Sequence, residues 1–158
     1  VFRDGIAHID AAYGGEDYTA FTCAKKVGNT LYMYGRLWHK HIDTVVDVCI
    51  SEAQRLMCAP ILSEDNGDKG FLAKEIMGKG YPVRSYHEKE NKYQKISEYL
   101  RKWWGNIVWL EGTDNDYLNQ IMDSTEDAEH DDAPDSAACM ARYWDRRSGE
   151  AYKSVFGG

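Results

Sequence analysis

Residues 5–17 read GIAHIDAAYGGED and set the start of the fold. The apolar first half predicts a buried strand that ends at a carboxylate, Asp10, and the glycine pair after it predicts a turn. The two segments that follow are rich in β-branched and aromatic residues and are joined by a Gly-Asn pair, which is typical of a hairpin. An antiparallel meander of three strands is therefore predicted over residues 5–12, 18–27 and 30–38.

The rest of the chain alternates apolar segments of helical spacing with short strand-like segments. Glycine stop signals and a proline start signal divide them. The predicted elements are, in order, helix 43–57, strand 60–64, helix 69–78, strand 81–86, helix 92–103, strand 107–110, helix 114–122 and a helix from Pro134 to about Arg146. This order predicts an α/β fold with a mixed sheet, in which parallel strands extend the meander and helices cover both faces.

Length and composition indicate one domain. A chain of 158 residues can bury a continuous core without disulfides, and its four cysteines form no C-x-x-C pair, which predicts free thiols in a reducing, cytoplasmic setting. No apolar segment reaches the roughly 20 residues that span a bilayer, so no membrane association is expected. We expect a domain over residues 1–147 and a flexible tail over 148–158. The absence of a starting methionine suggests a domain taken from a longer protein.

The net charge of −7 does not exclude a nucleic-acid partner, because the charge is unevenly distributed. Residues 111–135 contain ten Asp and Glu and no Lys or Arg, which leaves sixteen acidic against nineteen basic residues, or +3, for the rest of the chain. A weakly basic body around an acidic, cation-binding site is able to accept a polyanion.

Three acidic clusters at the ends of predicted elements indicate a divalent-metal site. Carboxylates brought together at strand ends repel one another unless protons or cations neutralise them, and hard oxygen ligands select Mg²⁺ or Mn²⁺. The third cluster opens a helix, where residues three or four apart share one face. The clusters are Asp10 with Glu16 and Asp17, Glu64 with Asp65, and Asp131 with Asp132 and Asp135.

Each cluster taken alone also has a structural interpretation. The first would be solvated in a hairpin turn, the second would belong to an Asx-type turn before the next helix, and the third would favour the helix dipole. These interpretations leave Asp10 unexplained, because it ends an apolar strand, and they do not account for three acids at one helix start. Asp17, Asp65 and His130 are secondary candidates, the histidine as a proton carrier beside the site.

The helix predicted over 92–103 is basic and aromatic, and it allows two interpretations. Lys92 and Lys95 are candidates for contacts with DNA phosphates. The alternative is an amphipathic helix on the core, which we expect for its larger side chains. Those expected in the core are Tyr93, Ile96, Leu100 and Trp104.

The acids and the basic helix occur in an order that resembles the nuclease domain of phage terminase large subunits. The shared pattern consists of Asp-x-Ala-x-Gly-Gly-x-Asp from Asp10, Glu-Asp-Asn-Gly from Glu64, Lys-x-x-Lys-Ile from Lys92, and Asp-Asp-Ala-Pro-Asp-Ser-Ala from Asp131. It covers nearly the whole chain, from about residue 5 to residue 146. The resemblance implies a ribonuclease H-like fold, also seen in Holliday-junction resolvases, and cleavage of concatemeric viral DNA during packaging into a capsid.

The same resemblance implies two Mg²⁺ or Mn²⁺ ions held by catalytic residues Asp10, Glu64 and Asp132 or Asp131. The implied partners are double-stranded DNA, an N-terminal ATPase domain of the same polypeptide, the small terminase subunit and the portal, all in the host cytoplasm. No G-x-x-x-x-G-K-[ST] phosphate loop occurs in these residues, so the ATPase domain is expected outside this chain.

Three other functions stay open at this point. A junction resolvase would have the same fold. A catalytically silent module that docks DNA or the portal would use its acids only as helix caps. An actin-like nucleotide-binding domain would hold Mg²⁺-phosphate with Asp10 and Gly14-Gly15.

Overall fold

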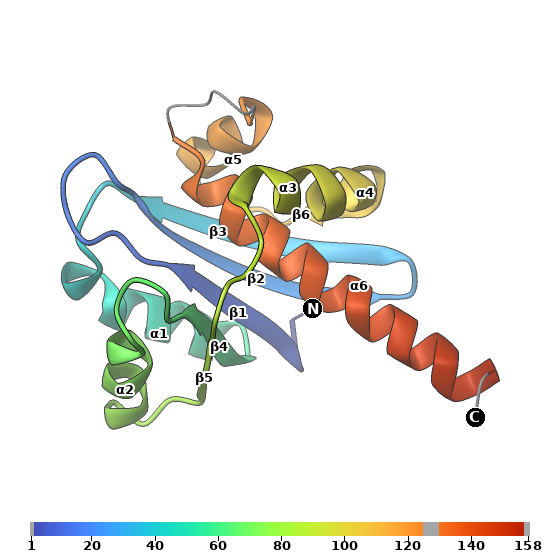
Figure 1. Cartoon of the computed structure of the whole chain (residues 1–158), viewed down its shortest axis with the longest axis horizontal. Coiled ribbons are helices and arrows are strands. Elements are labelled where there is room, and N and C mark those ends of the chain that lie inside the picture. Colours follow the sequence, from blue (N-terminus) through green and yellow to red (C-terminus); the bar gives the residue numbers. More distant parts are fainter. Residues whose placement is uncertain (1, 125–129, 157–158) are drawn as a thin grey trace.

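A six-stranded mixed sheet lies between two layers of helices in the computed structural model, which describes residues 2–124 and 130–156 (Figure 1). The strands are β1 (Gly5–Asp10), β2 (Thr19–Val27), β3 (Thr30–Trp38), β4 (Cys58–Glu64), β5 (Val83–Tyr86) and β6 (Ile107–Trp109). The α-helices are α1 (Val46–Arg55), α2 (Phe71–Gly78), α3 (Lys92–Lys95), α4 (Arg101–Trp103), α5 (Asn115–Met122) and α6 (Asp132–Phe156). Shorter helical turns are Ile42–Thr44, Ile96–Leu100 and Trp104–Asn106.

The strand order is β5-β4-β1-β2-β3-β6. β2 runs antiparallel to both of its neighbours, β1 and β3, whereas the pairs β1–β4, β4–β5 and β3–β6 are parallel. The predicted meander, its extension by parallel strands and the mixed α/β sheet are therefore confirmed. β1 is shorter than predicted, since it ends at Asp10 rather than at residue 12.

The sheet separates two hydrophobic cores. Helices α1 and α2 cover one face, and α6 crosses the other face together with α3, α4 and α5 (Figure 1). Side chains alternate along β1, so that Ile6 belongs to the core under α6 while Ala7 and Ile9 belong to the core under α1. By the same alternation Asp10 falls on the α6 face.

Small residues let α6 approach the sheet closely. Four of its alanines are fully buried, namely Ala133, Ala137, Ala138 and Ala141. The helix continues to Phe156, so the predicted end near Arg146 is wrong. It runs through Gly149, because one glycine inside a helix costs only about 1 kcal/mol relative to alanine. The flexible tail expected from residue 148 stays a prediction.

Residues 92–106 form one helical run that contains a π-helical turn at Ile96–Leu100. The wider turn shifts the buried face of the helix relative to an ideal α-helix. Tyr99 and Leu100 are consequently both buried, whereas Trp104, which was predicted to lie in the core, is 42% exposed. The helix is amphipathic as predicted, but the aromatic side chain that it buries is that of Tyr99 rather than that of Trp104.

All four cysteines are buried and free, as expected for thiols that act as small hydrophobic side chains. None of the helices in the described ranges combines the length and apolarity needed to cross a membrane.

Candidate metal centre

Two carboxylates lie next to each other at the carboxyl ends of neighbouring strands. β1 and β4 pair in parallel with Ile9 opposite Ser63, so Asp10 and Glu64 follow at the same edge of the sheet. Alternation along the strands directs both toward the α6 face. They line one cavity of about 170 Å³, which Lys92 also lines.

The start of α6 brings further carboxylates to this edge. The backbone N–H of Tyr18 donates to Oδ2 of Asp132 at 3.1 Å, which ties the loop between β1 and β2 to the first turn of α6. Asp135 lies one turn further along and its side chain is only 1% exposed, whereas the side chain of Asp131 is 37% exposed. The loop contact therefore gives Asp132 a defined position, 3.6 Å from the ammonium nitrogen of Lys92.

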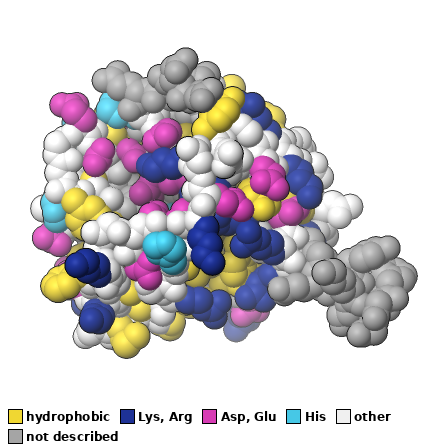
Figure 2. Space-filling view, viewed as in Figure 1, with side chains coloured by type: hydrophobic (Ala, Val, Ile, Leu, Met, Phe, Trp, Pro, Cys, Tyr) yellow, Lys and Arg dark blue, Asp and Glu magenta, His cyan; other side chains and the backbone are white. Residues whose placement is uncertain are grey.

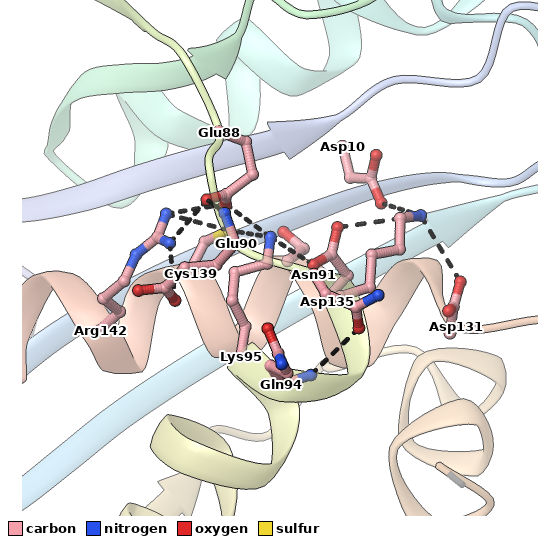
Figure 3. Close-up of polar contacts among 12 residues, drawn as sticks. Asp10, Glu88, Glu90, Asn91, Gln94, Lys95, Asp131, Asp135, Cys139 and Arg142 are labelled. Carbon is pink, nitrogen blue, oxygen red and sulfur yellow. Dashed lines mark hydrogen bonds and ion pairs between the residues drawn. The ribbon is translucent and has the colours of Figure 1, made fainter. Parts of the chain in front are cut away.

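The ammonium group of Lys92 lies among these acids. Its Nζ is 3.5 Å from Oδ1 of Asp131, 3.6 Å from Oδ1 of Asp132, and 3.9 Å from Oδ2 of both Asp10 and Asp135. Figure 3 shows Asp10 from β1 and Asp131 and Asp135 from the start of α6 converging on this position. One positive charge is thus shared by four carboxylates.

Burial and mutual repulsion raise the pKa values of three of the acids. Burial, followed by the charge of Asp135, raises the pKa of Asp10 well above its usual range, and the same two causes raise the pKa of Glu64. Burial also raises the pKa of Asp132, although Lys92 opposes it. For Lys92 burial lowers the pKa, but the surrounding carboxylates outweigh burial and the net pKa is raised. The site holds more negative charge than one ammonium neutralises.

The chemistry of these residues fits a divalent cation. Oδ2 of Asp10 is buried and has no hydrogen-bond partner in the described part of the chain, so additional positive charge would satisfy it. Clustered carboxylate oxygens suit Mg²⁺ and Mn²⁺. As they stand, no three His, Cys, Asp or Glu side chains within residues 2–124 and 130–156 are grouped closely enough to hold an ion. Ion binding therefore requires the carboxylates to draw together and the ammonium of Lys92 to move aside.

A cap at the start of α3 directs Lys92 and Lys95 toward the acids. The side-chain oxygen of Asn91 accepts the backbone N–H groups of Tyr93 and Gln94 at 2.9 and 3.3 Å. This cap fixes where the helix begins, and residues three apart then share one face. The side chain of Lys92 is 45% exposed, and its contact with DNA stays a prediction.

Lys95 is fully buried and pairs with two acids. Its Nζ lies 2.6 Å from Oδ1 of Asp135 and 2.7 Å from Oε1 of Glu88 (Figure 3). The contact with Asp135 is a short, buried ion pair. Burial alone would raise the pKa of Glu88, but hydrogen bonds from Arg142 and Lys95 outweigh burial and lower the pKa to about 2. The side chain of Lys95 is 1% exposed and both of its acidic partners lie within the protein, and its contact with DNA stays a prediction.

The secondary candidates surround the acids. Asp17 is exposed in the loop before β2, and its charge contributes to the raised pKa of Asp132. Asp65 lies 3.1 Å from a histidine nitrogen in the loop after β5. His130 packs edge-on against the ring of Tyr18, with 4.9 Å between the ring centroids. Roles for these three residues in catalysis stay predictions.

A buried polar network, which no sequence motif indicated, attaches α6 to the sheet. Nδ1 of His8 lies 2.8 Å from Oγ of Ser136, and its Nε2 lies 2.7 Å from the hydroxyl of Tyr86. Oγ1 of Thr22 lies 2.9 Å from the same serine. Burial, followed by the charge of Lys95, lowers the pKa of His8 to about 3, so this imidazole is neutral at pH 7. In the sequence, the network is indicated only by the position of His8, which lies two residues before Asp10 and therefore on the same face of the strand.

The pH dependence of stability provides a test of the repulsion at Asp10. A carboxyl group with a raised folded-state pKa destabilises the fold as the pH rises through that pKa, because the folded state binds the proton more tightly than the unfolded state. In metal-free buffer we expect Asp10→Asn to be more stable than the wild type, by a margin that grows as the pH rises above about 4. Urea unfolding at several pH values measures this margin.

The pKa of His8 is lowered, so its effect on stability has the opposite pH dependence to that of Asp10. The stabilisation that the neutral imidazole contributes is lost as the pH falls through the ordinary histidine range toward 3. It is present in both proteins and cancels in the difference between them. A margin that does not change with pH would contradict the assignment of repulsion to Asp10.

Of three comparisons with known proteins, the one with solved structures finds proteins of the same fold. No family model matches the chain, and no curated protein matches it by sequence. The large terminase nuclease from thermophilic phage G20c, solved with bound zinc, matches with a TM-score of 0.65 at 20% identity, over 89% of this chain and 81% of that chain. The same nuclease was also solved with bound magnesium.

Two further structures extend the comparison. The human cytomegalovirus terminase nuclease domain, manganese-soaked and inhibitor-bound, matches with a TM-score of 0.60 at 13% identity, over 89% of this chain and 82% of that chain. A large terminase from a thermophilic bacteriophage, in complex with ATP-gamma-S, matches with a TM-score of 0.53 at 10% identity, over 84% of this chain and 38% of that longer chain. The chain has the ribonuclease H-like fold of the nuclease domains of large terminases.

Proposed function

We propose that the chain is a metal-dependent DNA endonuclease, the nuclease domain of a phage terminase large subunit that cleaves concatemeric viral DNA during genome packaging. The observation that carries the proposal is the convergence of carboxylates from β1, β4 and α6 at one sheet edge around Lys92. The fold supports the same class of reaction, because matched nuclease domains were solved with magnesium or soaked with manganese.

Asp10, Glu64 and Asp132 are the proposed catalytic metal ligands. Asp10 is best placed to serve two ions, because β1 lies inside the sheet between β4 and β2. Asp131 and Asp135 are additional candidates with less suitable positions, since the first is more exposed and the second is held by a buried lysine. We therefore propose Asp132 as the main ligand from α6.

Two Mg²⁺ or Mn²⁺ ions held there would activate the attacking water and neutralise the negative charge of the phosphodiester as it is cut. The contribution of the chain itself is placement. Paired strands hold Asp10 and Glu64 at one edge, and the Tyr18 N–H orients Asp132. Lys92 partly neutralises the acids when no ion is bound.

Double-stranded DNA is the proposed substrate. The longer terminase with the same fold was solved with ATP-gamma-S, which supports an ATPase domain of the same polypeptide as a partner. The small terminase subunit and the portal are further proposed partners, and the host cytoplasm is the proposed location.

Cleavage of supercoiled plasmid tests the proposal. The purified protein is expected to nick and linearise the plasmid with Mn²⁺ or Mg²⁺, and EDTA is expected to stop the reaction. A folded protein that cuts with neither metal would overturn the proposal in favour of a module that binds DNA or the portal without catalysis.

Adjacent acids at the end of β4 provide a matched pair of variants. Glu64→Gln should reduce the cleavage rate by about 10²-fold or more, because it removes a charge that faces Asp10. Asp65→Asn should reduce the rate much less than Glu64→Gln, because the side chain of Asp65 pairs with a histidine and does not line the cavity. Equal losses in both variants would contradict the assignment of Glu64.

A further inference from the structure

A basic pocket lies on the same face of the sheet as the acidic site, between β5 and α6. Its volume is about 270 Å³, and its floor contains a leucine and two tyrosines. Figure 2 shows Lys and Arg side chains around a hydrophobic hollow on this face of the molecule. We call it the arginine pocket, after Arg84 from β5 and Arg142, Arg146 and Arg147 from α6.

Two of these guanidinium groups are paired with acids and two are not. Arg142 and Arg146 each contact a glutamate in the segment after β5, at 2.8 and 3.5 Å. Arg147 lies over a tyrosine ring, 4.4 Å from its centroid, and Arg84 is exposed on the edge strand. In the described ranges neither Arg84 nor Arg147 forms an ion pair with a carboxylate. The pocket therefore has two positive charges available for a ligand.

The arginine pocket is aligned with the acidic site along two elements. On β5, Tyr86 pairs with Glu64, and Arg84 lies two residues earlier on the same face, roughly 7 Å back along the strand. On α6, Arg142 and Arg146 follow Asp135 at distances of roughly 10 and 16 Å along the helix axis. Each strand of a DNA duplex carries one phosphate per about 3.4 Å of its axis. Spacings of roughly 7 to 16 Å correspond to a phosphate about two to five nucleotides from one held at the acids.

We propose that the arginine pocket binds a backbone phosphate of the DNA duplex, on the side of the cut that extends past β5. This inference rests on the proposed nuclease function and names a second contact with the same substrate. Guanidinium groups match phosphate oxygens as bidentate donors, and the apolar floor reduces the competing hydration of that contact. A phosphate contact carries no sequence information, so the pocket positions the duplex without selecting a cleavage sequence.

Duplex binding measured against salt concentration tests the inference. Fluorescence anisotropy of a short labelled duplex is recorded with Ca²⁺ in place of Mg²⁺ or Mn²⁺. The double variant Arg84→Ala/Arg147→Ala is expected to bind about tenfold more weakly, with the slope of log K against log salt reduced in magnitude by about one to two. Arg84→Lys/Arg147→Lys keeps both charges and should restore most of the slope.

The control is Lys74→Ala/Lys79→Ala, which removes the same charge from exposed positions on α2 and directly after it, on the opposite face of the sheet. It should leave the slope close to that of the wild type.

An unchanged slope in Arg84→Ala/Arg147→Ala, with metal-dependent cleavage intact, would overturn the proposed phosphate contact at the arginine pocket while leaving the nuclease proposal in place. Weaker binding of a polyglutamate peptide with normal duplex binding would also overturn it, in favour of an acidic protein partner. Failure of the nuclease proposal is a separate outcome, because the folded wild type would then fail to cut plasmid with either Mn²⁺ or Mg²⁺.

Discussion

Asp10→Asn is expected to reduce plasmid cleavage by about 10²–10³-fold or more while the protein stays folded. Asparagine keeps the shape of the side chain but removes the charge needed to hold a cation at the end of β1. Asp10 is also the acid whose buried Oδ2 lacks a hydrogen-bond partner in the described part of the chain. The measurement is the initial rate of loss of supercoiled plasmid in Mn²⁺ and in Mg²⁺.

The matched control is Asp47→Asn, because Asp47 is on α1, on the other face of the sheet, and its side chain is 80% exposed. Its cleavage rate should equal that of the wild type. Stability in EDTA separates lost chemistry from lost folding, since Asp10→Asn relieves repulsion and should not lower the unfolding midpoint. Full Mn²⁺-dependent cleavage by Asp10→Asn would remove Asp10 from the proposed ligands.

Lys95→Met is expected to lower the free energy of unfolding by about 3–5 kcal/mol, because it removes one partner from a buried network of charges. The side chains of Lys95 and Asp135 are each 1% exposed, and that of Glu88 is 8% exposed. Without the ammonium group, the carboxylate of Asp135 keeps its desolvation penalty and loses its closest cation. The loss is large against a total stability of about 5–15 kcal/mol for a typical domain. Urea unfolding with EDTA present measures it.

Lys102→Met provides the comparison for an exposed pair. Lys102 lies 2.9 Å from Asp145, but its side chain is 62% exposed, so solvent screens the interaction and the expected loss is at most about 1 kcal/mol. Similar losses for Lys95→Met and Lys102→Met would show that the buried network does not contribute to stability as described.

The order of elements was predictable because its signals are local. Period-two alternation, Gly-containing turns and a proline at a helix start depend on residues close together in the chain. These signals gave the meander, the alternating strands and helices, and the mixed sheet, all confirmed by the strand pairing. The resemblance to terminase nuclease domains was likewise confirmed for the fold.

Helix details were less predictable, because packing changes them. The π-helical turn at Ile96–Leu100 places Tyr99 rather than Trp104 in the core, and periodicity assumes an undistorted helix. α6 passes Arg146 because its stop signal is a single glycine, which a long helix tolerates.

The sequence alone identified the acids that end β1, end β4 and begin α6, because a carboxylate at the end of an apolar segment is a local signal. The roles of the basic residues depended on the tertiary structure. Lys92 and Lys95 belong to the same short helix, yet one faces the acid cluster and the other is buried with Asp135. The arginine pocket likewise requires residues of β5 and α6 to come together in the folded chain. Electrostatic partners are set by distances between distant segments, and those distances exist only after the helices have packed on the sheet.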